Sequence, residues 1–364
     1  MSQVPTIPAQ QKVLFVMTKQ GALEVQDADI AQLDPGEVLI KVEAAIVNPV
    51  DWKIYKAGLW FPDSAYPMVI GFEGAGTVTA VGSDVSHLEV GDRVAMSGHL
   101  KNKTSLFQQY ASIRADMVPR IPSSISFDGA AAMIGSFWNV AISLYNPHEK
   151  ATGLRLTPPW TAEGRGKFSG RAALVMGGTC TWDGLAPLQC LRASGFSPIV
   201  VAADTDSFTL VLEAGATHVV DRSLPPDALL EEVTKIAGKR ADVVFDAISR
   251  PETQNAAYHL TASGGSVLLV CPNAIEEAQR VKREGEGEAI NVVDVHALPT
   301  LPANVGFGPE LVRGFETLVA EESLSPVPIE VLPDGLRGVA AGITRLEAKP
   351  EGGTKLVIHP HETV

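Results

Sequence analysis

A glycine pair stands where a short apolar segment turns directly into a segment of helical character. Residues 172–176 (AALVM) run into Gly177 and Gly178, and a helix is predicted over 185–194, with Pro187 in its first turn. A strand, a glycine turn and a helix in this order present backbone N–H groups to a pyrophosphate, aided by the helix dipole. The pattern departs from G-x-G-x-x-G because its glycines are adjacent and Gly184 comes late. Alone, it leaves open a dinucleotide-binding turn and a plain structural turn.

The end of the next predicted strand bears on which dinucleotide would bind. An acid there bonds the ribose 2′-hydroxyl of NAD, whereas NADP needs room and positive charge. Residues 201–207 read VAADTDS, so small residues come first and Asp204 and Asp206 follow. Arg222, just past the third predicted strand, could reach a phosphate or could be a solvent-exposed arginine. The pattern favours NADPH.

Metal-binding residues are sparse. The three cysteines, Cys180, Cys190 and Cys271, have no metal-type spacing and are too few for a disulfide framework. The eight histidines include no pair of the H-x-x-x-H kind. We therefore predict no metal site.

The elements that must position the glycine turn follow from apolar periodicity. Short apolar runs at 199–203, 218–221, 243–247 and 266–270 are separated by helix-length segments, which is typical of a buried parallel sheet. Before residue 130 the chain is β-rich, with strands predicted at 12–16 and 37–45. Its closely spaced glycines favour a small distorted barrel over a loose set of hairpins.

Two further segments connect and close these regions. Helical spacing predicts one or two helices over 127–144, and residues 146–170, rich in proline and glycine, read as a long loop that is functional or mobile. Strands are predicted again near 329–332 and 355–359.

Composition narrows the classes of function. The chain has 364 residues, 45% of them hydrophobic, and a formal net charge of −13. An acidic surface repels phosphate backbones and anionic lipid, so no nucleic-acid or membrane partner is expected. No apolar run approaches the roughly 20 residues that span a bilayer. We expect a cytoplasmic protein.

Four motifs carry a resemblance over nearly the whole chain. Residues 48–53 (NPVDWK), 71–78 (GFEGAGTV) and 90–94 (VGDRV), followed by the glycine turn, resemble the medium-chain dehydrogenase/reductase superfamily. The resemblance implies an α/β architecture of two domains. A GroES-like β-barrel substrate domain would comprise residues 1–130 and 306–364, and a Rossmann NADP-binding domain with a doubly wound parallel sheet would comprise residues 131–305.

Within that superfamily, the motifs resemble the zinc-free branch. Zinc alcohol dehydrogenases carry a cysteine near the first motif and Gly-His-Glu in the second, where this chain has NPVD and Phe72. Glu73 is then expected to be structural. The chain is most similar to fungal trans-acting enoyl reductases of polyketide biosynthesis, which share N-P-x-D-x-K and a proline-rich insertion before the glycine strand.

The resemblance also implies the site residues. Lys53 would lie beside the nicotinamide and the substrate carbonyl, and Asn139 near the carboxamide. Coenzyme contacts are implied for Asn48, Pro49, Asp51, Lys53, Gly177, Gly178, Thr179, Cys180, Thr181, Asp204, Thr205, Arg222, Cys271, Pro272, Thr354 and Lys355.

Reduction of a polarised C=C needs a hydride, which NADPH supplies, a donor for the carbonyl oxygen and a proton for the α-carbon. Lys53 and backbone N–H groups are candidate donors, although Lys53 could instead only position a ribose or phosphate. Tyr55 or solvent could give the proton, and Tyr55 could equally be a packing residue.

Three functions remain open from the sequence. The first is an enoyl reductase acting on a small-molecule or acyl-carrier-bound α,β-unsaturated substrate, with a possible polyketide synthase partner. Basic residues in or beside the insertion could then receive an acidic carrier: Lys150, Arg155, Arg165, Lys167 and Arg171. The second is a quinone or alkenal reductase acting on free molecules, and the third is a catalytically silent nucleotide-binding scaffold.

Overall fold

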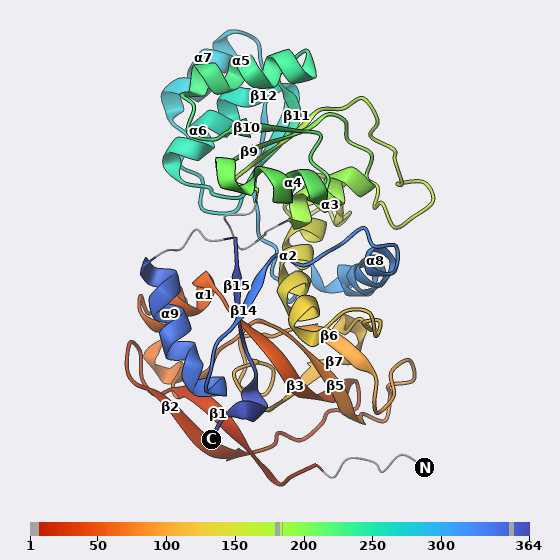
Figure 1. Cartoon of the computed structure of the whole chain (residues 1–364), viewed down its shortest axis with the longest axis vertical. Coiled ribbons are helices and arrows are strands. Elements are labelled where there is room, and N and C mark those ends of the chain that lie inside the picture. The colour runs from red at the N-terminus through yellow and green to blue at the C-terminus, as the bar shows by residue number, and fades with distance from the viewer. Residues whose placement is uncertain (1–6, 179–182, 184, 349–352) are drawn as a thin grey trace. The chain divides into compact units, whose positions relative to one another are not determined.

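The computed structural model describes residues 7–178, 183, 185–348 and 353–364. The chain forms two compact units, residues 1–135 with 326–364 and residues 136–325. Figure 1 labels their helices and strands.

The first unit is built on β-strands. Its long central strand β3 (Glu37–Val47) pairs with β5 (Glu73–Val81) on one side, and with β7 (Tyr110–Arg114) and β15 (Lys355–Ile358) on the other. The remaining elements are β1 (Gln10–Val16), β2 (Leu23–Asp29), β4 (Met68–Val69), β6 (Arg93–Ser97), β14 (Ile329–Val331), α1 (Pro49–Tyr55) and α9 (Val339–Ala348). A separate sheet has the order β2-β1-β4.

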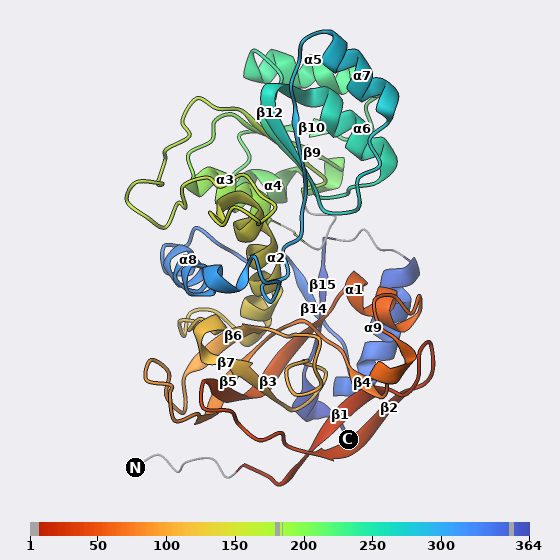
Figure 2. The same cartoon turned by 180° about the vertical axis from the view of Figure 1, so that it is seen from behind.

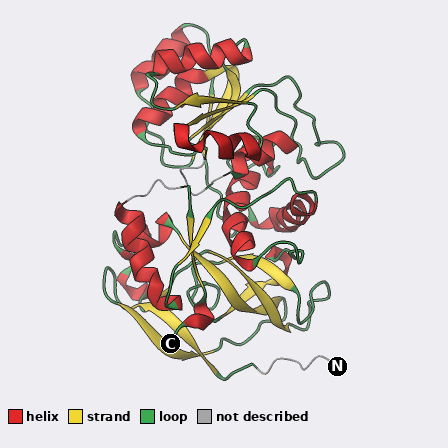
Figure 3. Cartoon of the chain, in the orientation of Figure 1, coloured by secondary structure: helices red, strands yellow, loops and turns green. Residues whose placement is uncertain are grey.

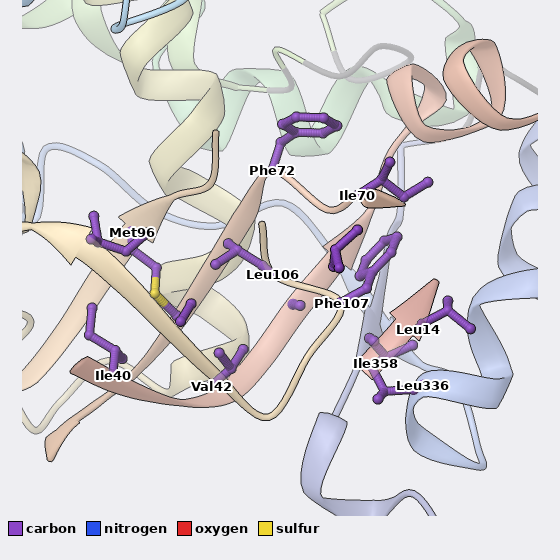
Figure 4. Packing of buried hydrophobic residues seen from close by; sticks show 14 of the residues in the cluster. Leu14, Ile40, Val42, Ile70, Phe72, Met96, Leu106, Phe107, Leu336 and Ile358 are labelled. Atoms are coloured by element: carbon purple, nitrogen blue, oxygen red, sulfur yellow. The ribbon is translucent and has the colours of Figure 1, made fainter. Parts of the chain in front are cut away.

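The core of this unit draws on distant parts of the chain. Figure 4 shows Ile40 of β3 and Met96 of β6 in one cluster with Leu336 and Ile358 from the carboxyl-terminal segment. The strands approach closely where β3 shifts register, and a Cβ on Gly76 would lie 2.0 Å from the carbonyl oxygen of Lys41. Glycine is therefore required there, and the punctuating glycines of the sequence serve a distorted barrel rather than loose hairpins.

The second unit contains a six-stranded parallel sheet of order β10-β9-β8-β11-β12-β13. Renumbered from the first strand, this is the 3-2-1-4-5-6 order of the dinucleotide-binding fold. The strands are β8 (Ala173–Met176), β9 (Ile199–Ala203), β10 (His218–Asp221), β11 (Ala241–Asp246), β12 (Thr261–Leu269) and β13 (Asn291–Asp294). Strand β9 is buried along its whole length, because a parallel sheet is covered on both faces.

Helices lie on both faces of this sheet (Figures 1 and 3). They are α3 (Ala186–Ala193), α4 (Phe208–Ala214), α5 (Pro226–Ala237), α6 (Pro251–Leu260) and α7 (Glu277–Gly285). Helix α2 (Phe127–Tyr145) begins in the first unit and ends in the second, and α8 (Gly308–Ala320) packs on it through contacts of Phe315 with Phe137 and Trp138. This packing places α8 in the second unit, whereas the sequence predicted a return to the first domain at residue 306.

Most of the predicted elements are confirmed, some with shifted ends. The predicted strands at 199–203 and 218–221 have the bounds of β9 and β10, while β11 begins at Ala241 rather than 243. Residues 127–144 form one helix, not two. The insertion at 146–170 has neither helix nor strand (Figure 2), as predicted. No helix among the described residues is long and apolar enough to cross a membrane.

Candidate active site

The glycine turn lies at the carboxyl end of β8, as predicted. Gly177 and Gly178 have φ of 99° and 50°, in the left-handed region that favours glycine. A Cβ on Gly178 would meet Val201 of β9 and Val211 of α4 at 2.9 and 3.0 Å. The turn is thus pressed against its neighbours with no room for a side chain. The predicted contacts Thr179, Cys180 and Thr181 lie outside the described residues.

The order of the strands puts this turn at the part of the sheet where ligands bind in such folds. Strand β8 lies between β9 and β11, so the connections from β8 and from β11 leave toward opposite sides of the sheet. In open parallel sheets, ligands bind in the crevice at the carboxyl ends of the strands beside such a reversal. The glycine turn lies at that edge of the sheet, and its backbone and small residues suit a pyrophosphate.

The predicted ribose-binding residues pair with one another. Asp204 follows β9, and its Oδ1 accepts a hydrogen bond of 2.6 Å from Nε of Arg222, which follows β10. Both side chains remain partly exposed, and Thr205 opens a 3-10 turn beside them. An acid and a base are thus both present where the adenosine ribose would lie.

The segment after β12, which contains the predicted residues Cys271 and Pro272, is held by side chains that follow β11. The backbone N–H of Cys271 donates to Oγ of Ser249 at 3.1 Å, and Nε2 of Gln254 donates to the carbonyl oxygen of Pro272 at 3.1 Å. Ser249 and Gln254 were not predicted as site residues, because nothing in their local sequence marks a contact with a segment some 20 residues later.

Asn139 of α2 also has a partner that sequence analysis missed. Its Nδ2 donates to Oδ1 of Asp183 at 3.1 Å, and Asp183 is buried within the glycine-turn segment. The sequence did contain a sign that Asp183 has a specific role, because it is the single acidic residue in an otherwise uncharged stretch between Gly177 and Ala186.

In the first unit, the 48–53 motif forms the start of helix α1. Pro49 is its first residue, and Asp51 Oδ2 accepts the backbone N–H of Asn48 at 2.7 Å, which satisfies a donor at the helix end. Burial raises the pKa of Asp51 to about 8; the Asn48 N–H opposes this rise and the nearby Glu73 carboxylate adds to it. Asp51 therefore carries a proton at neutral pH.

The two candidate chemical groups of α1 lie further along the same helix. Lys53 is half-buried in its last turn. Tyr55 packs against the hydrophobic core, with the ammonium of Lys56 5.9 Å from its ring centroid. The contacts of Tyr55 are those of a packing residue.

Glu73 and Lys355 form a buried ion pair of 2.8 Å between the first residues of β5 and β15. Their side chains are 1% and 8% exposed. A Cβ on Gly135 of α2 would lie 2.0 Å from Oε1 of Glu73, so glycine makes room for this carboxylate. The ammonium of Lys355, predicted to face the coenzyme, is directed to Glu73, while the neighbouring Thr354 is exposed.

Residues of other types occupy the positions that would bind zinc in alcohol dehydrogenases. Phe72 is buried in the hydrophobic core, and Glu73 is engaged by Lys355. Within the described part of the chain, no group of three or more His, Cys, Asp or Glu side chains could hold a metal ion. Burial raises the pKa of the Cys190 thiol far above its usual value, so it is a neutral core residue.

Family models match both units. Residues 34–133 match the alcohol dehydrogenase GroES-like domain, and residues 184–282 match the model described as zinc-binding dehydrogenase. Together the two models cover more than half of the chain. They confirm the predicted combination of a GroES-like domain and a Rossmann-type domain.

Curated relatives align over nearly the full length. The trans-enoyl reductase thnE of Trichoderma harzianum is 28% identical, over 98% of this chain and 97% of the relative. The enoyl reductase component lovC of the lovastatin nonaketide synthase, from Aspergillus terreus, is 26% identical over 98% and 99%. These relatives confirm the predicted resemblance to fungal trans-acting enoyl reductases.

Solved structures share the fold. An alcohol dehydrogenase superfamily protein from Novosphingobium aromaticivorans superposes with a TM-score of 0.79 at 22% identity, over 96% of this chain and 99% of that one. The CurK enoyl reductase superposes with a TM-score of 0.71 at 22% identity, over 96% and 98%.

Proposed function

Because the chain belongs to the medium-chain dehydrogenase/reductase superfamily, we propose that it is a zinc-independent, NADPH-dependent enoyl reductase that acts in trans in polyketide biosynthesis. The observation that carries the proposal is its full-length similarity to curated trans-enoyl reductases, which covers 98% of the chain. The dinucleotide-type sheet, with its glycine turn at the point of reversal, supplies the coenzyme site that such a reaction needs.

The chemistry divides between coenzyme and chain. A bound reduced nicotinamide supplies the hydride for the β-carbon of the polarised alkene. The ammonium of Lys53 stabilises the negative charge that develops on the carbonyl oxygen, where a fixed donor contributes about 3 kcal/mol. The α-carbon takes its proton from solvent, since Tyr55 is used in packing.

Zinc independence is proposed from the residues present. The motif NPVD brings a proline and a helix-capping aspartate where zinc enzymes bring a thiolate. Phe72 offers a hydrocarbon in place of an imidazole ligand, and Lys355 already neutralises the adjacent Glu73. Metal analysis of the purified, active protein tests this point, and one tightly bound zinc per chain would refute it.

NADPH is proposed over NADH because Arg222, which follows β10 beside Asp204, would supply a guanidinium to a 2′-phosphate. Its guanidinium is held by Asp204, so the phosphate would replace one anionic partner of Arg222 with another. The protein is proposed to work in the cytosol, in keeping with its few cysteines, of which Cys190 and Cys271 are free.

The insertion is proposed to receive an acidic acyl carrier protein. Residues 146–171 carry five basic side chains and two acidic ones in a chain of net charge −13. Lys150, Arg155, Arg165 and Lys167 are exposed. Arg165 is paired with Glu321 at 2.5 Å, which reduces its attraction for a carrier, whereas Lys167 donates only to the uncharged Oγ1 of Thr157.

One comparison of substrates tests both the activity and the docking. Purified protein with NADPH is offered the same enoyl chain on an acyl carrier protein and on a small thioester, beside quinones and alkenals. We expect the thioesters to be reduced and the carrier-bound one to be preferred. In R165E/K167E only the carrier-bound rate should fall, by about tenfold at low salt. Equal loss on both substrates would refute the docking face, and turnover of quinones alone would refute the enoyl reductase.

A further inference from the structure

Ser249 has a backbone conformation that a side chain makes costly. It follows β11, is buried, and has φ of +55°, in the left-handed region where glycine is the usual residue. A non-glycine residue persists there only when its surroundings fix it, and such positions cluster at functional sites. The surroundings of Ser249 are therefore informative.

The carboxylate of Asp246, at the end of β11, fixes the turn. Its Oδ1 accepts the backbone N–H groups of Ser249 at 2.9 Å and Ile248 at 3.2 Å, and its Oδ2 accepts the hydroxyl of Thr253 at 2.9 Å. Asp246 is fully buried, and burial raises its pKa to about 6. Three donors converge on this one side chain and hold Ser249 in place.

The side chain of Ser249 in turn connects this turn to the next one along the sheet. Its Oγ accepts the backbone N–H of Cys271 at 3.1 Å and lies 3.3 Å from Nε2 of Gln254. The amide of Gln254, also buried, donates to the carbonyl oxygens of Ser249 and Pro272 and accepts the N–H of Ala274 at 2.6 Å. The segment 271–274 is thus held by Ser249 of the loop after β11 and by Gln254 in the first turn of α6.

Both loops lie at the binding edge of the sheet. Asp246 is in register with Met176 on one side and with Leu269 on the other. The N–H of Ala247 donates to the carbonyl oxygen of Met176, the residue before the glycine pair. The tie between Ser249 and Cys271 therefore lies at the carboxyl ends of the strands next to the glycine turn, where a dinucleotide binds.

We propose that Ser249 and Gln254 are positioning residues, which hold the segment 271–274 as a preformed wall of the coenzyme pocket and so set the affinity for NADPH. The inference rests on the proposed coenzyme-dependent function. It assigns a use to the strained serine, because its hydroxyl provides the acceptor that a glycine would lack. Preorganisation of this kind raises affinity by removing the cost of ordering a loop on binding.

Ser249→Gly separates this role from a structural one. Glycine adopts φ of +55° without strain, and this relief offsets the cost of the lost hydrogen bond to Cys271, so the variant should unfold at a urea concentration close to that of the wild type. It loses the acceptor for Cys271, so its Kd for NADPH, measured by calorimetric titration, should rise about three- to tenfold. Glu322→Gly is the matched control, because Glu322 is an exposed residue of the same unit with φ of +54°. Its Kd should equal that of the wild type.

A second readout follows the loop itself. The thiol of Cys271 is partly buried, and its alkylation by iodoacetamide can be followed by peptide mass spectrometry. We expect faster alkylation of Cys271 in S249G than in the wild type without coenzyme, and protection of both by saturating NADPH. An unchanged Kd and alkylation rate in S249G, with a wild type that binds NADPH, would overturn the positioning role alone. A wild type that binds neither NADPH nor NADH would overturn the proposed function and this inference with it.

Discussion

Asp51→Asn should make the folded chain less sensitive to rising pH. Asp51 is fully buried, and its pKa lies at about 8 in the folded chain against 3.8 for the unperturbed group. Between these values the folded state binds one more proton than the unfolded state. Since stability falls with pH wherever the folded state holds more protons, the wild type loses stability as the pH rises toward 8. Asparagine is nearly isosteric with the protonated acid and can still accept the N–H of Asn48.

The magnitude follows from one proton. A pKa difference of one unit corresponds to about 1.4 kcal/mol, so this group alone costs the wild type about 3 kcal/mol between pH 5 and pH 7. The free energy of unfolding of D51N minus that of the wild type should therefore rise by that amount over this interval. Other titrating groups are common to both proteins and cancel in the difference.

Urea unfolding of both proteins at pH 5, 6 and 7, followed by circular dichroism, measures this difference. Infrared difference spectra of the wild type minus D51N at pH 6 add a direct check, because the carboxyl band of protonated Asp51 should remain in the difference, whereas the contribution of Asp246 is common to both proteins and cancels. A difference in stability that does not change with pH would show that Asp51 is ionised in the folded chain. The conclusion that burial and the Glu73 carboxylate raise the pKa of Asp51 would then be wrong.

Four further substitutions test two charged pairs. Lys355→Met leaves Glu73 buried without its cation and should lower the free energy of unfolding in urea by about 3–5 kcal/mol. Adding Glu73→Gln should recover most of that loss. Additive losses in the double variant would contradict the pairing. Arg222→Ala should weaken the binding of NADPH about tenfold and leave the binding of NADH unchanged, and Asp204→Asn should strengthen the binding of NADPH. Equal effects on the affinities for both coenzymes in titrations would contradict a phosphate site.

Buried parallel strands were predicted well because their sequence signal is strong. Strand β9 (IVVAA) is covered on both faces, so its whole length is apolar and its ends are visible in the sequence. Strand β2 (LEVQDAD) was missed because it lies at the edge of its sheet, where most of its side chains are exposed and polar residues are tolerated. The pattern of apolar residues therefore indicates which strands are buried, and it does not detect strands that are exposed.

Helix α1 was missed for a different reason. It has only seven residues, too few for a periodic pattern, and its start is fixed by a contact between Asp51 and the backbone of Asn48. The NPVD motif contains a proline and an acid in the first turn, both typical of a helix start. This local signal was available in the sequence but was used only for the family resemblance.

The site was predicted as a set of positions, not as a set of contacts. Motifs indicated Asn139, Asp204, Arg222, Cys271 and Lys355, but each partner had to come from the fold. Glu73 and Lys355 are 282 residues apart in sequence, and Ser249 meets Cys271 through the pairing of β11 with β12. Local patterns contain no information on such distances, so the pairing of Lys355 with Glu73 could not be foreseen.

The insertion shows how a segment without secondary structure can still offer a preformed surface. Trp160 is buried among Phe137, Tyr145 and Phe307, and its Nε1 donates to Glu310 at 3.4 Å. The backbone N–H groups of residues 154 and 156 donate to carbonyl oxygens at the end of α2. These anchors are aromatic and backbone groups, to which the exposed basic side chains add surface contacts, such as those of Arg165 with Glu321 and Lys167 with Thr157. Charge reversal on the insertion should therefore alter recognition without unfolding the segment, because the buried aromatic and backbone anchors remain when the exposed basic contacts are lost.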